Sequence, residues 1–191
     1  MIARIYKRNY NVVDTIINVN KVIIENQIIK TINGGHIMKI GIIVHSITNN
    51  TYSVAQKLHD KLIEAGHEVE IRRVSMVGGD RPKGKNIELE NPPDVSPYDA
   101  LIFGSPVHAF SLAPAMRVYL EQIPSVQDKK IALYVTKGLR FDWTGGTRAI
   151  GQMKKICQSK GGIIMGTGII VWNKQRDQKI AEIVQKFSTL F

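Results

Sequence analysis

The sequence is poor in cysteine and has no long hydrophobic run. One cysteine, Cys157, stands among 191 residues, which excludes an internal disulfide framework and a metal site built from several cysteines. No stretch approaches the ~18 consecutive apolar residues that a membrane span needs. Residues 1–37 also lack the uninterrupted apolar core of a signal peptide. The sequence therefore predicts a cytoplasmic protein with no membrane partner.

Acidic residues are scarce relative to basic ones. Asp and Glu total 16 against 26 Lys and Arg, which gives a formal net charge of +10. Such an excess raises nucleic acid as a partner, but the basic residues are dispersed. Their densest group has no interleaved aromatic residues on which bases could stack; it comprises Arg72, Arg73, Arg81, Lys83 and Lys85. We expect no nucleic-acid partner, and we interpret this group as a solvated face or as a docking surface for an acidic partner protein.

Residues 1–37 differ from the rest of the chain. They are rich in Ile, Asn, Val and Lys and show neither a period of 2 nor one of 3.6. At Met38 the pattern changes to that of a buried strand. We expect an N-terminal extension over 1–37, with Met38 as the native start, and one domain over 38–191. The alternative is a genuine N-terminal arm, with a short hairpin that turns at Asn33-Gly34.

From Met38 onward, buried-strand and amphipathic-helix patterns alternate. Strands are expected over residues 39–44, 67–74, 100–104, 131–136 and 163–172, and helices over 52–65, 114–122, 147–160 and 177–187. Residues 75–97 are rich in Gly, Pro and Lys, and any helix there is short. The alternation predicts a doubly wound α/β domain: a five-stranded parallel sheet in the order 2-1-3-4-5 with helices on both faces. In such a sheet the ligand binds at the loops after strands one, three and four.

The first of these loops is rich in hydroxyl and amide side chains and directly precedes a helix. Ser46, Thr48, Asn49, Asn50 and Thr51 lie where free backbone N–H groups and the helix dipole favour an anion. The segment resembles the phosphate loop of flavodoxins, Thr/Ser-x-Thr-Gly-Asn-Thr, with Asn49 in the place of the family's Gly. Asn is the non-Gly residue that best tolerates a left-handed backbone. The alternative is an ordinary helix cap with no ligand.

The second loop follows the third strand and reads Gly-Ser-Pro-Val-His-Ala-Phe. Its Gly-Ser-Pro segment is similar to the flavodoxin pattern Gly-Ser/Thr-Pro-x-aromatic. The resemblance implies that the loop contacts the flavin ring, with candidate residues Ser105, Pro106, Val107, His108 and Phe110. His108 or Phe110 would pack against the ring. The alternatives are that Phe110 is a core residue that anchors the loop, and that His108 is an ordinary hydrogen-bonded loop histidine.

The third loop follows the fourth strand and carries two aromatic residues on a polar background. In flavodoxins this loop closes over the ring. The resemblance therefore implies a role for Thr136, Lys137, Gly138, Phe141 and Trp143, the last two as stacking side chains. Lys137 or Arg140 would stabilise negative charge on the reduced flavin. A solvated loop charge is the alternative for Arg140.

These three loops together identify a flavodoxin-like domain whose cofactor is FMN. The resemblance implies an electron carrier that works with redox partner proteins, acidic ones included, and in which no side chain is catalytic and no metal is bound. The alternative is an FMN-dependent NAD(P)H:quinone-type oxidoreductase on the same fold, and a binding module that has lost its flavin is a third. The chain departs from flavodoxins in charge, because flavodoxins are typically acidic.

Overall fold

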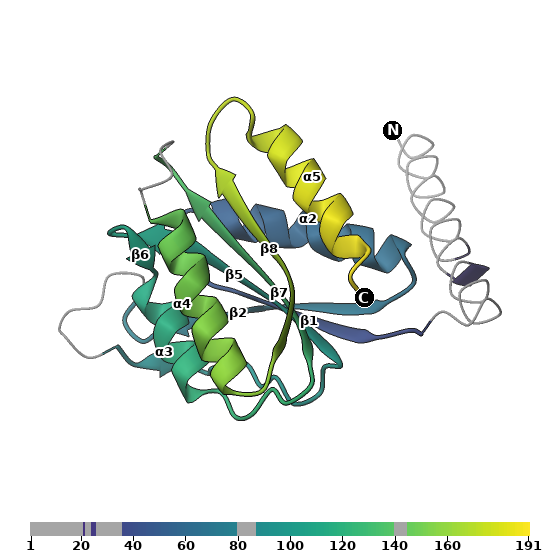
Figure 1. Cartoon of the computed structure of the whole chain (residues 1–191), viewed down its shortest axis with the longest axis horizontal. Coiled ribbons are helices and arrows are strands. Elements are labelled where there is room, and N and C mark those ends of the chain that lie inside the picture. Colours follow the sequence, from purple (N-terminus) through teal and green to yellow (C-terminus); the bar gives the residue numbers. More distant parts are fainter. Residues whose placement is uncertain (1–20, 22–23, 26–35, 80–86, 140–144) are drawn as a thin grey trace, which may run out of the picture.

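The computed structural model describes residues 21, 24–25, 36–79, 87–139 and 145–191. Within them, five parallel strands form one sheet in the order β2-β1-β5-β7-β8 (Figure 1). The strands are β1 (Lys39–Val44), β2 (Glu68–Arg73), β5 (Ala100–His108), β7 (Lys130–Lys137) and β8 (Ile163–Val171). In chain order this is 2-1-3-4-5, which confirms the predicted flavodoxin-like topology.

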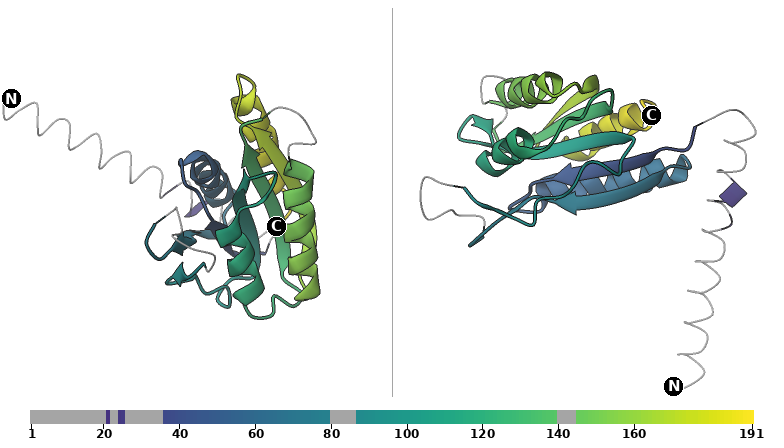
Figure 2. Two further views of the ribbon diagram at one scale, coloured as in Figure 1. Left: turned by 90° about the vertical axis from the view of Figure 1, so that its left-hand side faces the viewer. Right: turned by 90° about the horizontal axis from the view of Figure 1, so that it is seen from below.

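Four helices in the described residues cover the two faces of the sheet. They are α2 (Asn50–Glu64), α3 (Pro114–Gln122), α4 (Gly146–Ser159) and α5 (Arg176–Ser188). Helices α2 and α5 pack on one face and α3 and α4 on the other, so that each face has its own apolar core (Figure 2). The predicted helices agree with these bounds to within two residues, because each carries an apolar stripe at the helical period.

The third strand is longer than predicted. The sequence suggests an end at Gly104, but β5 continues to His108 and then pairs with the short antiparallel strand β6 (Ser111–Leu112). Pro106 is tolerated in this extension because the ladder between β5 and β1 ends at Gly104, while the ladder with β7 reaches Pro106. The predicted second loop is therefore mainly strand, with a tight hairpin at its tip.

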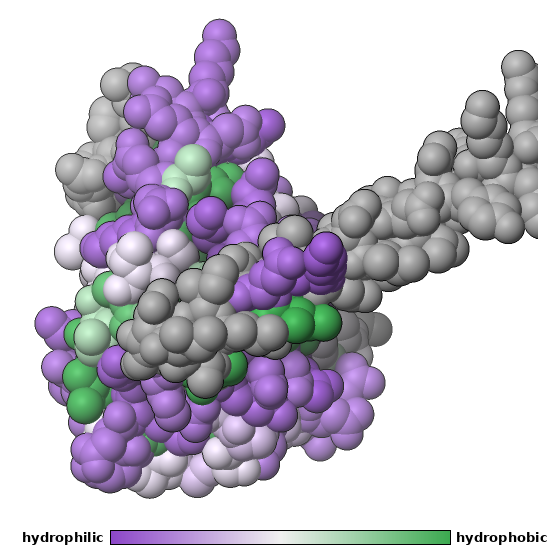
Figure 3. Space-filling view, turned by 90° about the vertical axis from the view of Figure 1, so that its right-hand side faces the viewer, coloured by the Kyte–Doolittle hydropathy of each residue, from purple (hydrophilic) through white to green (hydrophobic). Residues whose placement is uncertain are grey.

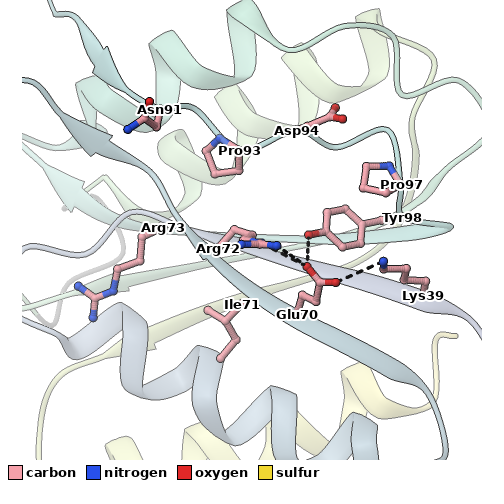
Figure 4. Close-up of a pocket in the computed structure, with 10 residues that line it drawn as sticks. All are labelled: Lys39, Glu70, Ile71, Arg72, Arg73, Asn91, Pro93, Asp94, Pro97 and Tyr98. Atoms are coloured by element: carbon pink, nitrogen blue, oxygen red, sulfur yellow. Dashed lines mark hydrogen bonds and ion pairs between the residues drawn. The ribbon is translucent and has the colours of Figure 1, made fainter.

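The connection from β2 to β5 contains no helix in its described residues. It holds two short antiparallel strands, β3 (Ser75–Met76) and β4 (Leu89–Glu90), followed by an irregular segment that packs against the sheet. Beside this segment and β2 lies an open cleft of about 520 Å³, lined by charged residues and prolines (Figure 4). A crossover helix would ordinarily cover this part of a doubly wound sheet.

Hydrophilic side chains predominate on the face shown in Figure 3, and hydrophobic ones occur in small patches. No helix in the described part of the chain is long and apolar enough to cross a membrane. Cys157 lies on the buried side of α4, and burial raises the pKa of its thiol to about 12, so that it is an inert packing residue.

Candidate functional site

The predicted phosphate loop lies between β1 and α2, and its N-cap residue does not cap the helix with its side chain. Asn49 has a left-handed backbone (φ 61°) and makes no side-chain cap hydrogen bond. The Oγ of Ser46 accepts a hydrogen bond from the N–H of Tyr52 (3.2 Å). Within the described residues the N–H groups of Asn50 and Thr51 have no partner, which is the arrangement that suits an anion at a helix N-terminus.

A buried tyrosine braces the start of α2 from beneath. The hydroxyl of Tyr134, on β7, donates to the carbonyl oxygen of Thr51 (2.8 Å), and the hydroxyls of Thr51 and Thr136 hydrogen-bond to each other (2.8 Å). The Tyr134 ring fits because β5 has Gly104 here: a Cβ at Gly104 would lie 2.2 Å from Cζ of Tyr134. Thr51 and Thr136, both predicted as cofactor contacts, are thus buried and engaged with each other.

The end of β2 is tied to the same loop. The N–H of Val74 donates to the carbonyl oxygen of Val44 (2.9 Å), and Nδ1 of the buried His45 donates to the carbonyl oxygen of Val74 (3.0 Å). One residue earlier, a guanidinium nitrogen of Arg73 donates to Oδ1 of Asn49 (2.9 Å). Sequence reasoning placed Arg73 in a dispersed basic group. The signal that could have found it is its place at the carboxyl end of the strand beside β1.

The hairpin that joins β5 to β6 is held in a strained conformation. Its two turn residues, Ala109 and Phe110, both have positive φ (45° and 58°), a conformation that costs non-glycine residues on the order of 1–3 kcal/mol each. Oε1 of Gln152 on α4 accepts from the Oγ of Ser111 and the N–H of Leu112 (2.9 Å each). Strain that is kept and clamped in this way is typical of functional loops.

The hairpin also lies against the start of α4. Gly145 at the α4 N-cap has φ 91°, and a Cβ there would come within 2.3 Å of the Phe110 backbone. The packing brings the hairpin next to the segment that follows β7. Of the predicted residues on the hairpin, Ser105 is fully buried and donates to the carbonyl oxygen of Pro106, whereas His108 is exposed.

The third loop exposes its backbone to solvent at Gly138, directly after β7. Lys137 is buried, whereas Gly138 is exposed, and no described heavy atom lies within 4 Å of the position where its Cβ would be. Backbone at Gly138 is therefore accessible to a ligand. The predicted stacking residues Phe141 and Trp143, and the predicted charge of Arg140, lie outside the described residues.

Each of the three connections exposes one large apolar side chain. Ile47, Phe110 and Leu139 are 45%, 48% and 57% exposed. Because β1, β5 and β7 are parallel neighbours, the loops that follow them emerge at one edge of the sheet. That edge therefore carries a helix N-terminus with hydroxyl, amide and guanidinium groups, next to backbone and apolar side chains that suit a planar ring. The residues present fit FMN, which has a phosphate and a flat ring system.

Comparison with solved structures places the fold among flavodoxins and related flavoproteins. Oxidised flavodoxin 2 from Bacillus cereus has 19% identity and a TM-score of 0.60, covering 80% of this chain and 99% of that one. Two-electron reduced flavodoxin from Megasphaera elsdenii has 19% identity and a TM-score of 0.58 (78% and 98% covered). A Lactobacillus acidophilus flavoprotein in complex with FMN has 16% identity and a TM-score of 0.53 (76% and 97% covered). At these identities the likeness concerns the fold.

Sequence comparison defines the class and then the family. The family model described as NADPH-dependent FMN reductase matches residues 38–177. A curated relative from Archaeoglobus fulgidus, NAD(P)H dehydrogenase (quinone), is 30% identical over 95 residues, which cover 44% of this chain and 50% of the relative. The chain thus spans about half the length of that relative. The protein is an FMN flavoprotein of the oxidoreductase class. It belongs to the NADPH-dependent FMN reductase family.

These comparisons confirm the predicted FMN cofactor and the flavodoxin-like fold. They do not confirm the electron carrier, which the sequence analysis placed first. The family description and the Archaeoglobus fulgidus relative favour the alternative, an NAD(P)H-dependent oxidoreductase. The flavodoxin resemblance could not separate the two, because one fold hosts both functions.

Proposed function

We propose that the protein is an FMN-dependent oxidoreductase that takes electrons from NAD(P)H and passes them to a quinone-type acceptor. The observation that carries this proposal is the family match over residues 38–177. The name of the Archaeoglobus fulgidus relative supports the nicotinamide donor and the quinone acceptor. An electron carrier would depend on protein partners for both steps.

The exposed apolar side chains at the sheet edge support a small-molecule reaction. Nicotinamide and quinone rings are planar and largely apolar, and such rings bind against apolar side chains with few polar contacts. Ile47, Phe110 and Leu139 present surface of this kind, one from each connection. An exposed apolar rim beside the cofactor site suits a ring that enters and leaves in every turnover.

The side chains of this protein bind and orient the cofactor. Ser46, Thr48 and Asn50, together with the first N–H groups of α2, would hold the phosphate, and the hairpin and Gly138 would border the ring. FMN, when bound, supplies the redox chemistry by accepting electrons from a nicotinamide and giving them to the acceptor. Gln152 clamps the hairpin and Tyr134 braces the start of α2, and this support of two parts of the edge limits the reorganisation needed on binding.

Anaerobic mixing of the FMN-loaded protein with NADPH, and separately with NADH, tests the proposal. We expect rapid loss of the oxidised flavin absorbance and many turnovers when a soluble benzoquinone is added, relative to free FMN at the same concentration. If neither nucleotide reduces the bound flavin, while dithionite reduces it through an accumulating one-electron-reduced form, the protein is an electron carrier and the proposal is wrong.

A further inference from the structure

Arg73 is held at the mouth of the phosphate loop by two contacts. It is the last residue of β2 and pairs in register with Val44, the residue from which the loop leaves β1. A guanidinium nitrogen donates to Oδ1 of Asn49 (2.9 Å), and the guanidinium carbon lies 3.8 Å from the centroid of the Tyr52 ring. A cation stacked over an aromatic ring in this way is restricted in position.

The charge of Arg73 is not neutralised by any carboxylate among the described residues. Both of its contacts, an amide and a phenol ring, are neutral. By contrast, Lys39 and Arg72 each form an ion pair with Glu70 (3.2 and 2.9 Å). Figure 4 shows Arg73 extending away from that cluster. A guanidinium has five N–H donors, and Asn49 uses one of them in the described part of the chain.

We propose that Arg73 determines specificity for the phosphorylated flavin, by supplying full positive charge to the FMN phosphate. The inference rests on the proposed phosphate site at residues 46–51. Hydroxyls and a helix N-terminus offer only partial charges to a phosphate group that carries nearly two negative charges at neutral pH. An arginine adds a full charge and a donor geometry that matches phosphate oxygens.

Asn49 makes a contact in this arrangement that the glycine of the flavodoxin phosphate-loop pattern could not make, because glycine has no side chain. Its backbone has the left-handed conformation that favours glycine at this position, and asparagine is one of the few other residues that adopt it readily. Its side chain then provides the acceptor that holds Arg73. Asn49 is therefore a positioning residue, and Arg73 is the group that would meet the phosphate.

Binding of FMN and riboflavin to the full chain, each followed by flavin fluorescence at low and high salt, tests the inference. R73Q should raise the Kd for FMN by about tenfold or more, because a charge-assisted hydrogen bond is lost, and should leave the Kd for riboflavin unchanged. The salt dependence of FMN binding should weaken in R73Q.

Two further variants grade the effect. The Kd of R73K for FMN should lie between those of wild type and R73Q, and N49G should raise this Kd by less than R73Q does. The matched control is R72Q, on the same strand and paired with Glu70, which should bind both flavins like wild type.

The readout separates the inference from the proposed function because no nicotinamide is present. An unchanged FMN Kd in R73Q would overturn the inference, and so would parallel weakening of both flavins, which would make Arg73 a structural support of the loop. In a separate steady-state assay of NADPH oxidation, a raised KM for NADPH with an unchanged FMN Kd would also overturn it, by assigning the charge to the nucleotide. If wild type binds riboflavin as tightly as FMN, the phosphate site itself is wrong. Urea unfolding of each variant confirms that it is folded.

Discussion

Two tyrosines on opposite faces of the sheet both pack over a glycine, but their hydroxyls donate to different groups. Tyr134 lies over Gly104 of β5, and Tyr98 lies over Gly41 of β1; in both places a Cβ on the glycine would come within 2.5 Å of the ring. The Tyr134 hydroxyl donates to a backbone carbonyl at the start of α2. The Tyr98 hydroxyl donates to the Glu70 carboxylate at the charged cleft (2.9 Å).

The two sides of the sheet also differ in whether a carboxylate is available to the neighbouring arginine. On the side of Tyr98, one carboxylate accepts from the tyrosine, from Lys39 and from Arg72, so the cations there are already paired. On the side of Tyr134, the hydroxyl donates to the backbone carbonyl of Thr51, and the partners of Arg73 are the neutral side chains of Asn49 and Tyr52. Two adjacent arginines thus have different partners because successive side chains of a strand point to opposite sides of the sheet.

The largest expected effect on stability comes from adding a methyl group to the glycine under each tyrosine ring. G104A and G41A should both lower the free energy of unfolding, by about 1–3 kcal/mol for an overpacked core. G104A should cost more, because Tyr134 is fully buried while Tyr98 borders the open cleft and can shift outward. Urea unfolding measures both. Only G104A should also weaken FMN binding, since it displaces the brace of α2.

A matched control for these variants is G151A, on the exposed side of α4. No heavy atom lies within 4 Å of its added Cβ, so the substitution should stabilise the helix by up to about 1 kcal/mol. If G104A unfolded at the same urea concentration as wild type, the packing of Tyr134 over Gly104 would be disproved.

The next effect comes from removing the two hydroxyls while keeping the rings. Y134F leaves the buried Thr51 carbonyl without this donor and should cost about 1–3 kcal/mol, with weaker FMN binding. Y98F should cost less than about 1 kcal/mol, because Glu70 keeps Lys39 and Arg72 at an exposed site. Urea unfolding and flavin fluorescence are the measurements. Equal losses of FMN affinity in Y134F and Y98F would contradict the prediction that only the Tyr134 hydroxyl supports FMN binding.

The smallest effect concerns the pH dependence of the cleft network. Hydrogen bonds from Tyr98, Lys39 and Arg72 hold the pKa of Glu70 below its ordinary value. A carboxylate with a lowered folded-state pKa stabilises the protein above its unfolded-state pKa of about 4.3, and this contribution is lost as the pH falls through the folded-state value. E70Q should therefore be slightly less stable at pH 7 and lose less stability on acidification than wild type.

Thermal unfolding of E70Q between pH 7 and pH 3 measures this contribution. The control is Glu68→Gln, an exposed residue of the same strand that forms no ion pair within the described residues. A pH profile of E70Q that parallels that of E68Q would show that the network adds nothing to stability.

Much of the fold could be predicted because each element carries its own signal. Strand β1 is a continuous buried run, and α2 and α5 carry apolar stripes at the helical period. The extension of β5 to His108 could not be predicted, because it depends on pairing with β7 and on a hairpin clamped by Gln152 from α4. Local sequence around Ser-Pro-Val-His indicates a loop, and long-range pairing overrides it.

The sequence by itself determined the doubly wound order and the place of the polar loop between β1 and α2, since both are encoded by contiguous residues with a fixed period or spacing. Only the tertiary structure decided the partners of Arg72 and Arg73, which composition places in one basic group. Strand register brings Arg73 to Asn49, 24 residues away in the chain, and turns Arg72 to Glu70 on the other side. The physical reason is that the partners of a charge are the groups within a few ångströms of it. The pleat of β2 sets Glu70 beside Arg72, whereas a segment distant in sequence brings Asn49 to Arg73.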